Sequence, residues 1–591
     1  MARPANQRQQ WHLLLSLPVV LGSACFLATV SKAAEPKHLP ASTEERLEND
    51  ALKTAIMGAL LFLDDTQIRQ RHGLHDPRFD ACSGDGCLPL VPGTGQALPL
   101  PLPFTNNRKG EWANFIHIFP DVLSPHNAEN ESIIQIQDSN MFMTTAITYP
   151  LYLFDETGLP EGKRSVTDIR RQAVDSIRSY QHEESFTFWP RLAGSSSDKE
   201  RVGPLNIPMK AGSLQNVFPS RRKTSNDNYS TWSTDLFNPA INPYGVDALA
   251  NIPADADDTA LAASTLELAA AFDGADRPSP SLTEGLLKWR DLGRVREDGR
   301  DTWKGQDSGG FLTWLKDENV PREDRFMTPE TGVIPLGVNN VDCVVNANAL
   351  LALGLQGLGD SAVVGDVSAL MAKAVEQHSW PECGLYYPQR MIFPYSLTRA
   401  YRDGGIRTPA MKSAMRRLLF DLLREQRDLA ASSPKHAGAF SGGADPTYDL
   451  ATGLALAGLL NIGEGIAAEA GVLVDYQKAL VAAVDYLTSH QEKVQIKFGT
   501  TFNRDNDRFL FPNPKDKARK WDSGVFFSAS NWKLAQWRSD SYTAAIVLEA
   551  LAKYALAYEQ SDDSLLNGPR LRVVSYGRNA DDASKQLILT K

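Results

Sequence analysis

Six stretches of the chain begin with Asp, Asn, Ser or Thr and continue into small and aliphatic residues at helical spacing. A polar residue followed by such a run is typical of a helix that starts at an N-terminal cap. Each stretch carries Ala, Gly or Thr early and Leu later, which favours a helix packed on nearly all sides. The predicted buried helices are 42–63, 138–154, 255–272, 340–358, 447–461 and 540–559.

More charged, amphipathic stretches lie between these helices, at 166–181, 361–377, 409–427 and 471–490. Their apolar positions recur on one face, as in helices of an outer layer. We therefore predict an all-α fold, an α/α toroid of about six helical hairpins. Three loops are longer than simple connections need, and we expect them to gather at one mouth of the ring: 73–136, 183–250 and 293–338.

The first 33 residues have the pattern of a secretory signal. Arg3 and Arg8 precede the apolar run 13–30, and residues 31–33 supply small side chains at a cleavage site. An uncleaved N-terminal anchor is the alternative, because about 18 apolar residues approach the length of a membrane span. We expect cleavage, no stable membrane span afterwards, and a periplasmic or secreted protein.

The mature region 34–591 is predicted to be one α/α-toroid domain. The helical pattern leaves open a division into two barrels, 40–250 and 251–560. The whole chain has 61 Lys and Arg against 71 Asp and Glu, a net charge of −10. Removal of 1–33 takes away three basic residues and no acid, which leaves a net charge of −13. Because no basic stretch stands out from this background, nucleic acid is not an expected partner.

Four of the five cysteines lie beyond the signal, in a chain expected to meet an oxidising compartment. Cys82 and Cys87 enclose a short flexible loop and are predicted to form a disulfide. Cys343 and Cys383 lie in apolar settings, where buried free thiols and a second bridge are both open. The spacing of Cys and His matches no zinc site, so no metal is predicted.

The sequence DADDTA at 255–260 places three carboxylates at the start of a predicted helix. One interpretation is structural, because Asp255 can cap the helix and Asp257 and Asp258 are favoured by the positive end of its dipole. The other is chemical. Crowded carboxylates do not all ionise easily, so one is kept protonated and can act as a general acid on an alkene or a glycosidic oxygen.

The same string resembles the DxDDTA motif of class II terpene cyclases and squalene-hopene cyclases. The segment NANALLAL at 346–353 is similar to an NxNxLLAL element of the bacterial and fungal members, and FLTW at 311–314 precedes it in the same order. The resemblance implies the α/α toroid of terpenoid cyclases and protein prenyltransferases. It also implies that Asp257 protonates a carbon–carbon double bond of an isoprenoid, that Asp255 and Asp258 orient it, and that no cofactor is needed.

A predicted exported location also suits a carbohydrate-active enzyme on an α/α toroid, either a glycosidase or a polysaccharide lyase. A glycosidase needs a second carboxylate across a cleft, and acidic residues at the predicted helix starts are the candidates: Asp138, Asp342, Asp449 and Asp540. A third alternative is a toroid that only binds a polymer or a protein partner. In that case the DADDTA string is no more than a helix cap.

Aromatic and amide side chains near the predicted mouth are the candidates for substrate contact. Those chosen as substrate-binding are Trp232, Trp314, Asn346, Asn348 and Tyr387. Further aromatic residues that could stack on a sugar or line an apolar chamber are Trp189, Tyr244, Trp380, Tyr386, Trp521 and Trp537. The arginines in 386–390 and 395–403 could hold an anionic group, but in an acidic chain we expect them to pair with acids.

Overall fold

The computed structural model describes residues 43–68, 108–118, 134–154, 159, 164–190, 252–293, 307–315, 339–443, 447–493, 517–528 and 535–558. The chain divides into two compact units, Met1–Leu47 and Glu48–Lys591. The predicted signal lies outside the described residues. All of the helices and strands considered below, apart from the first residues of the first helix, belong to the second unit.

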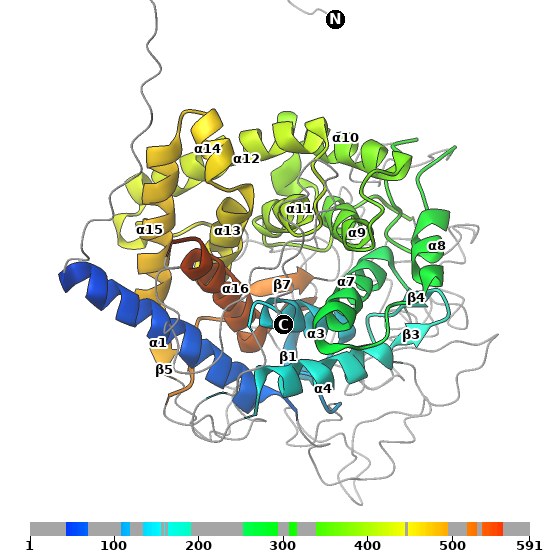
Figure 1. Ribbon diagram of the computed structural model, residues 1–591, viewed down its shortest axis with the longest axis horizontal. Coiled ribbons are helices and arrows are strands. Elements are labelled where there is room, and N and C mark those ends of the chain that lie inside the picture. The colour runs from blue at the N-terminus through cyan, green and yellow to red at the C-terminus, as the bar shows by residue number, and fades with distance from the viewer. Residues whose placement is uncertain are drawn as a thin grey trace, which may run out of the picture. The chain divides into compact units, whose positions relative to one another are not determined.

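Six helices form an inner ring in which each packs against the next, and the last packs against the first (Figure 1). Their apolar sequences explain this position, since most of their side chains are buried all around the helix. The inner ring consists of α3 (Met141–Leu151), α7 (Ala256–Asp273), α9 (Cys343–Leu355), α11 (Ile392–Arg402), α13 (Asp449–Ile462) and α16 (Asp540–Tyr558).

A second layer of helices surrounds the inner ring (Figure 1). These helices are amphipathic and turn their apolar faces inward. They are α1 (Thr43–Thr66), α4 (Val166–Arg178), α8 (Pro280–Lys288), α10 (Ala362–Glu376), α12 (Pro409–Ser432) and α15 (Leu473–His490), with the short α14 (Glu464–Glu469) between α13 and α15. Along the described chain, outer and inner helices alternate as six hairpins, and the predicted all-α toroid is confirmed.

Polar caps start three of the inner helices, α3, α7 and α9, as the sequence predicts, whereas α11 and α13 begin without a side-chain cap. Asn140 caps α3 and accepts the Met143 N–H, and Asp342 caps α9 and accepts the N–H of Val344. Asp255 caps α7 in an extended conformation. Such caps satisfy amide groups that the first turn of a helix leaves without partners.

One member of the inner ring differs from the prediction. The stretch 42–63 was expected to be a ring helix, but α1 stands in the outer layer, and most of its residues from Leu52 onward are buried, with Thr54 exposed. Its place in the ring is taken by α11, which the sequence shows only as a string of aromatic residues and arginines. The reason is that α11 buries Arg399 through hydrogen bonds to Tyr395 and Asn348, so the polar composition of this helix does not show that it lies in the inner ring.

A small antiparallel sheet, which the sequence did not predict, joins the two ends of the described chain. Its strands are β1 (Asn114–Ile118), β2 (Ile134–Asp138), β7 (Val525–Ser528) and β8 (Ala535–Arg538), in the order β2-β1-β8-β7. Asn114 pairs with Asp138, and Phe115 pairs with Arg538 on the other side. Strand β2 leads directly into α3, so the sheet lies at the N-terminal end of the inner ring.

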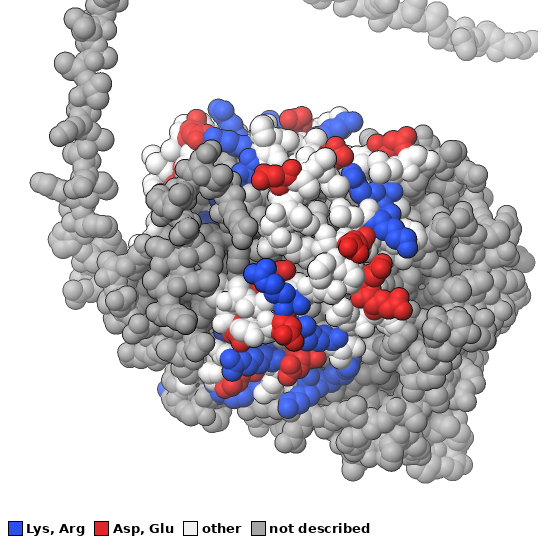
Figure 2. All heavy atoms as spheres, turned by 45° about the vertical axis from the view of Figure 1, so that its right-hand side comes forward, with Lys and Arg blue, Asp and Glu red and all other residues white. Residues whose placement is uncertain are grey.

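Two further pairs of short strands complete the structure, β3 (Gln181–His182) with β4 (Ser185–Phe186) and β5 (Glu492–Lys493) with β6 (Arg519–Lys520). On the face shown in Figure 2, basic and acidic side chains of the described residues are interspersed. Within the described part of the chain, no helix combines the length and apolar character needed to cross a membrane.

Candidate active site

The three carboxylates of the DADDTA string point in different directions because successive helix residues are about 100° apart. Asp255 is the cap of α7, and its Oδ1 accepts the Asp258 N–H at 2.7 Å. Its backbone forms β-bridges to Phe186 and Trp314, which holds the start of α7 against two loops. The capping interpretation therefore holds for Asp255, but it leaves the side chain of Asp257 unexplained.

Asp257 contacts two polar side chains from other parts of the ring. The amide Nδ2 of Asn348, on α9, donates to Asp257 Oδ1 at 2.7 Å. The hydroxyl of Tyr387, just before α11, forms a hydrogen bond with Asp257 Oδ2. Asp257 is 5% exposed, so both of its oxygens are fixed in a nearly dry environment.

Burial is the main influence on this carboxyl group. It raises the pKa of Asp257 well above the usual range, and the charges of Asp255 and Asp342 raise it further. The hydrogen bond from Asn348 and the charge of Arg399 lower the pKa, but they do not overcome burial. Burial and the neighbouring acids therefore favour the protonated form of Asp257, the form that can donate a proton.

The two flanking carboxyls form a coupled pair. Burial raises the pKa of both Asp255 and Asp258. Hydrogen bonds involving Asp258 lower the pKa of Asp255, whereas the charge of Asp255 raises the pKa of Asp258. A charge on Asp255 also raises the pKa of Asp257.

A cluster of aromatic rings adjoins the acid on the side of the sheet. Tyr387 lies 6.0 Å from Phe142 and 5.9 Å from Phe527, ring centre to ring centre. Phe527, on β7, also lies 5.2 Å from both Phe188 and Trp537 and is only partly buried. The aromatic cluster consists of Phe142, Phe188, Trp189, Tyr386, Tyr387, Phe526, Phe527 and Trp537.

Asp138 fixes two rings of this cluster. Its carboxyl oxygens accept the indole N–H of Trp189 at 3.1 and 3.2 Å and that of Trp537 at 3.4 Å, and Asn140 donates to it as well. Burial raises the pKa of Asp138 to about 7, despite the lowering effect of these hydrogen bonds. Asp138 thus fixes the orientation of the Trp189 and Trp537 side chains through their indole N–H groups.

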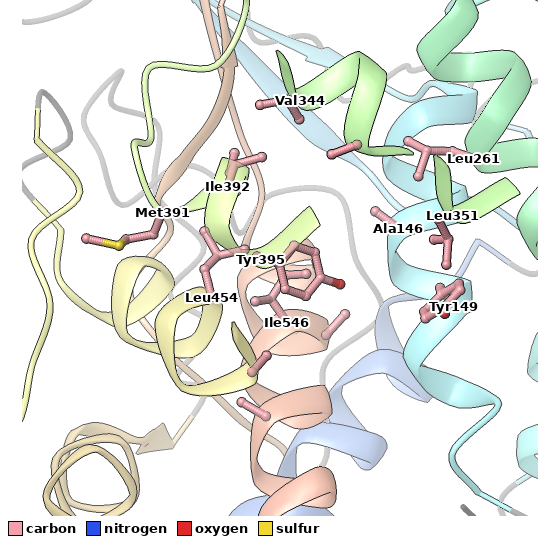
Figure 3. Packing of buried hydrophobic residues seen from close by; sticks show 14 of the residues in the cluster. Ala146, Tyr149, Leu261, Val344, Leu351, Met391, Ile392, Tyr395, Leu454 and Ile546 are labelled. Carbon is pink, nitrogen blue, oxygen red and sulfur yellow. The ribbon is translucent and has the colours of Figure 1, made fainter. Parts of the chain in front are cut away.

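The inner ring is packed with apolar and tyrosine side chains. Figure 3 shows Ala146 and Tyr149 of α3, Leu351 of α9, Tyr395 of α11 and Ile546 of α16 facing one another. All of these side chains are buried, at 0 to 7% exposure. Asp257 therefore lies beside the aromatic cluster, in the same inner ring as these buried apolar and tyrosine side chains.

The residues predicted to bind substrate are brought together to different extents. Asn348 and Tyr387 contact Asp257 directly. Trp314 donates its indole N–H to the Tyr386 hydroxyl at 3.1 Å, so it supports the aromatic cluster from behind. Asn346 instead binds the backbone of Phe311: its Oδ1 accepts the Phe311 N–H at 2.7 Å, and its Nδ2 donates to the Phe311 carbonyl at 3.0 Å. Trp232 and Tyr244 lie outside the described residues.

The structure describes one of the two cysteine pairs considered in the sequence. Cys343 and Cys383 form a disulfide across 40 residues, the alternative that the sequence left open. Cys343 is the first residue of α9, and the Leu385 N–H two residues after Cys383 donates to Asp342. The disulfide thereby ties the segment that carries Tyr387 to the helix that carries Asn348. Cys82 and Cys87 lie outside the described residues.

Sequence reasoning did not pick out Glu549 or Lys553, and it considered Arg399 only among the arginines of 395–403 that were expected to pair with acids. Arg399 donates to Asn348 and is 2% exposed, and Glu549 and Lys553 form a buried ion pair one turn apart on α16. The available signal was AIVLEALAKY at 545–554, in which two opposite charges interrupt an otherwise buried helix. Charges at such positions are rarely buried unless they are paired.

The candidate second carboxylates for sugar chemistry are all occupied by structural contacts. Asp342 accepts N–H groups from the first turn of α9. Asp449 accepts the Asp522 N–H at 3.0 Å, and Asp540 pairs with Lys520. Asp138 is held by indoles, as described above. Each of these groups has a role in holding an element in place, and none is placed with Asp257 across a cleft by a described contact.

No model of a known protein family matches the chain, and no curated protein sequence matches it. Among solved structures, the chain is similar to a variant of the type II terpene cyclase MstE from Scytonema in complex with geranylgeranyl dihydroxybenzoate, at 13% identity and a TM-score of 0.40. Ligand-free MstE gives 13% identity and a TM-score of 0.39, and a protein from Actinoplanes gives 13% and 0.38. Each similarity covers 86% of this chain and 99% of the other. At this degree of likeness no function is assigned, so the function has to rest on the residues around Asp257.

Proposed function

We propose that this chain is an exported enzyme of the class II terpene cyclase kind, in which Asp257 protonates a carbon–carbon double bond of an isoprenoid. The observation that carries the proposal is the setting of Asp257, a buried carboxyl at the start of an inner-ring helix, with a raised pKa and with each oxygen fixed by a different side chain. Export through the segment 1–33 is part of the proposal.

The proposed reaction begins with transfer of the Asp257 proton. The O–H bond breaks, the alkene π electrons form a new C–H bond, and the adjacent carbon becomes a carbocation. Further double bonds of the same substrate then attack this cation and close rings, until loss of a proton or addition of water ends the sequence. Asp257 is left as a carboxylate and takes up a proton from solvent before the next turnover. No external oxidant or reductant is needed.

The surroundings of Asp257 suit this chemistry. The negative faces of aromatic rings attract a cation, with an energy of about 1 to 2 kcal/mol for each well-placed ring once water is excluded. The aromatic cluster reaches the acid through Tyr387, whose ring contacts Phe142 and Phe527. Apolar side chains of the inner ring, such as Leu351 and Ile546, offer no nucleophile to the cation, and the buried carboxylates Asp403 and Glu549 are engaged by Lys553.

Sugar chemistry has less support from the same site. The carboxyls that a glycosidase would need as a partner for Asp257 hold helix starts, indoles or a lysine. The binding-only alternative leaves the raised pKa of Asp257 and its two fixed oxygens without a role.

The proposal is tested by product formation from defined isoprenoids. The mature protein is incubated with squalene, geranylgeranyl diphosphate and geranylgeranyl dihydroxybenzoate, beside a panel of acidic and neutral polysaccharides. We expect a cyclised product from an isoprenoid, and its loss by at least about 100-fold in Asp257→Asn, the lower range for removal of a general acid. Asp475→Asn, an exposed acid on α15, is the matched control and should retain full activity. New reducing or unsaturated sugar ends, without any cyclised isoprenoid, would overturn the proposal.

A further inference from the structure

Four charged side chains are buried together in the inner ring, on the side of Asn348 away from Asp257. Lys553 contacts Glu549 at 2.7 Å and Asp403 at 3.0 Å, and the Tyr395 hydroxyl donates to Glu549 at 2.6 Å. Arg399 is the fourth charge and donates to that same hydroxyl at 3.0 Å. Two cations therefore balance two anions, which is the condition under which buried charges are tolerated.

The guanidinium group of Arg399 is held rigidly. It lies between the rings of Tyr149 and Tyr395, 4.6 and 4.7 Å from their centres. The hydrogen bond to Tyr395 fixes its rotation within this stack. A planar, stacked guanidinium has a fixed set of N–H directions, unlike a lysine ammonium group.

One of those directions leads to Asn348. The Arg399 Nη2 donates to Asn348 Oδ1 at 3.1 Å, and Asn348 Nδ2 donates to Asp257 Oδ1 at 2.7 Å. An arginine has donors and no acceptor, so only the carbonyl end of the amide can face it. The NH₂ end of Asn348 must then point to Asp257.

The direction of this chain decides which oxygen of Asp257 carries the proton. The amide NH₂ of Asn348 can only donate, whereas the Tyr387 hydroxyl at Oδ2 can donate or accept. A neutral carboxyl group accepts hydrogen bonds best at its carbonyl oxygen, so the donor on Oδ1 leaves the hydroxyl at Oδ2, with Tyr387 as its acceptor. Oδ2 is the oxygen beside Tyr387 and the aromatic cluster. We infer that Arg399 is a positioning residue for the proton donor, which acts through Asn348 to place the Asp257 proton on Oδ2.

The interposed amide also explains why the pKa of Asp257 stays raised although a cation lies nearby. A guanidinium in direct contact with Asp257 would favour the carboxylate and lower its pKa strongly. With Asn348 between them, the charge of Arg399 lowers the pKa less than burial raises it. Arg399 thus fixes the orientation of the Asn348 amide without removing the proton from Asp257. The role of this chain in catalysis rests on the proposed function, whereas the position of the proton on Asp257 does not.

The placement is tested by infrared difference spectroscopy of the folded protein without substrate. The carbonyl band of protonated Asp257 is identified as the band that Asp257→Asn removes. In Arg399→Gln the neighbouring amide can donate or accept, so Asn348 loses its fixed orientation, and we expect the band to shift and broaden. In Arg399→Lys, which retains a donor-only cation, the band should stay closer to that of the wild type.

Turnover supplies the second measurement. We expect Arg399→Gln to lower kcat for cyclisation by about 10- to 100-fold, the range for a residue that orients a functional group, with KM within about twofold. Asn348→Ala should give a similar loss, and the double variant should lose no more than either alone, because both act on the same hydrogen bond.

Lys553→Met is the matched control, since it removes the other buried cation without a contact to Asn348. It should lower stability and leave the Asp257 band in place. A folded Arg399→Gln protein with an unchanged band, or an equal band shift in Lys553→Met, would overturn the inference. If Arg399→Gln does not fold, Tyr395→Phe is measured instead, because it removes the hydrogen bond that fixes the Arg399 guanidinium. We expect a smaller shift of the Asp257 carbonyl band in the same direction, and an unchanged band would contradict the inference. If the Asp257 band shifts in Arg399→Gln but the wild-type protein cyclises no isoprenoid, the placement of the proton is supported and the proposed function is contradicted.

Discussion

The clearest energetic consequence of the site concerns Asp138, the carboxyl behind the two tryptophans. Its pKa in the folded protein is about 7, against about 3.9 for an Asp in an unfolded chain. Between these values the folded protein holds a proton that the unfolded chain releases. The stability contributed by this site therefore falls as pH rises from about 4 to 7, by up to about 1.4 kcal/mol per pH unit, and levels off above pH 7.

Asp138→Asn removes this titration and retains an oxygen that can accept from the indoles and from Asn140. A difference of about three pKa units corresponds to about 4 kcal/mol, so the variant should gain about that much stability relative to the wild type between pH 4 and pH 8. Near pH 4, where Asp138 is protonated in both states, the two proteins should be nearly equal.

The assay is urea unfolding of the wild type and Asp138→Asn at several values between pH 4 and pH 8, followed by circular dichroism. The exposed Asp475→Asn serves as the control for the loss of one acid and should follow the wild-type curve at every pH. A pH-independent difference between Asp138→Asn and the wild type would refute the reasoning. It would mean that the three N–H donors hold the carboxylate as well as water does.

Three further changes test other parts of the structure. Tyr387→Phe removes a hydrogen bond worth about 1 to 1.5 kcal/mol, so the cyclisation rate should fall about 5- to 10-fold; a loss as large as that of the acid variant would contradict this. The double variant Cys343→Ser, Cys383→Ser opens a 40-residue loop and should lower the free energy of unfolding by about 2 to 4 kcal/mol, measured in urea; no loss would speak against the bridge. Gly354→Ala would place a methyl group 2.1 Å from the backbone oxygen of Gly404 and should lower the free energy of unfolding by about 3 kcal/mol. Gly365→Ala has open space around it and should raise the free energy of unfolding by about 0.5 to 1 kcal/mol. Equal urea midpoints for the two variants would refute the close approach of α9 to the turn after α11.

The fold was predictable where helices have caps and one dominant character. The apolar α7, α9, α13 and α16 were placed in the ring because Ala- and Leu-rich runs with polar starts have few other stable positions. The amphipathic α10 and α12 were placed outside it for the complementary reason. The alternation of these two kinds of helix was enough to predict the toroid.

What escaped prediction depends on contacts between distant residues. Helix α11 is polar by composition, and Arg399 is buried there through hydrogen bonds to Asn348, about 50 residues away, and to Tyr395. The Tyr395 hydroxyl in turn donates to Glu549, 154 residues further along the chain. The strands of the sheet have four or five residues each and pair segments from opposite ends of the chain. No local pattern in the sequence contains such pairings.

The candidate site shows the same division. Asp257 and Asn348 were found from the sequence, and the structure joins them by a hydrogen bond. The DADDTA string alone could not separate a cap from an acid, because both use carboxylates at a helix start. Burial and the two contacts with Asp257 separate them, with Asp255 as the cap and Asp257 turned toward Tyr387 and Asn348.

The most direct test of the account is the origin of the hydrogen that starts cyclisation. The mature protein is incubated in D₂O with an isoprenoid that it converts, and the product is analysed by mass spectrometry. Because Asp257 takes up its proton from solvent, the account predicts one non-exchangeable deuterium in each cyclised molecule from the wild type and no product from Asp257→Asn. A cyclised product without deuterium, or deuterated product from Asp257→Asn at the wild-type rate, would contradict it.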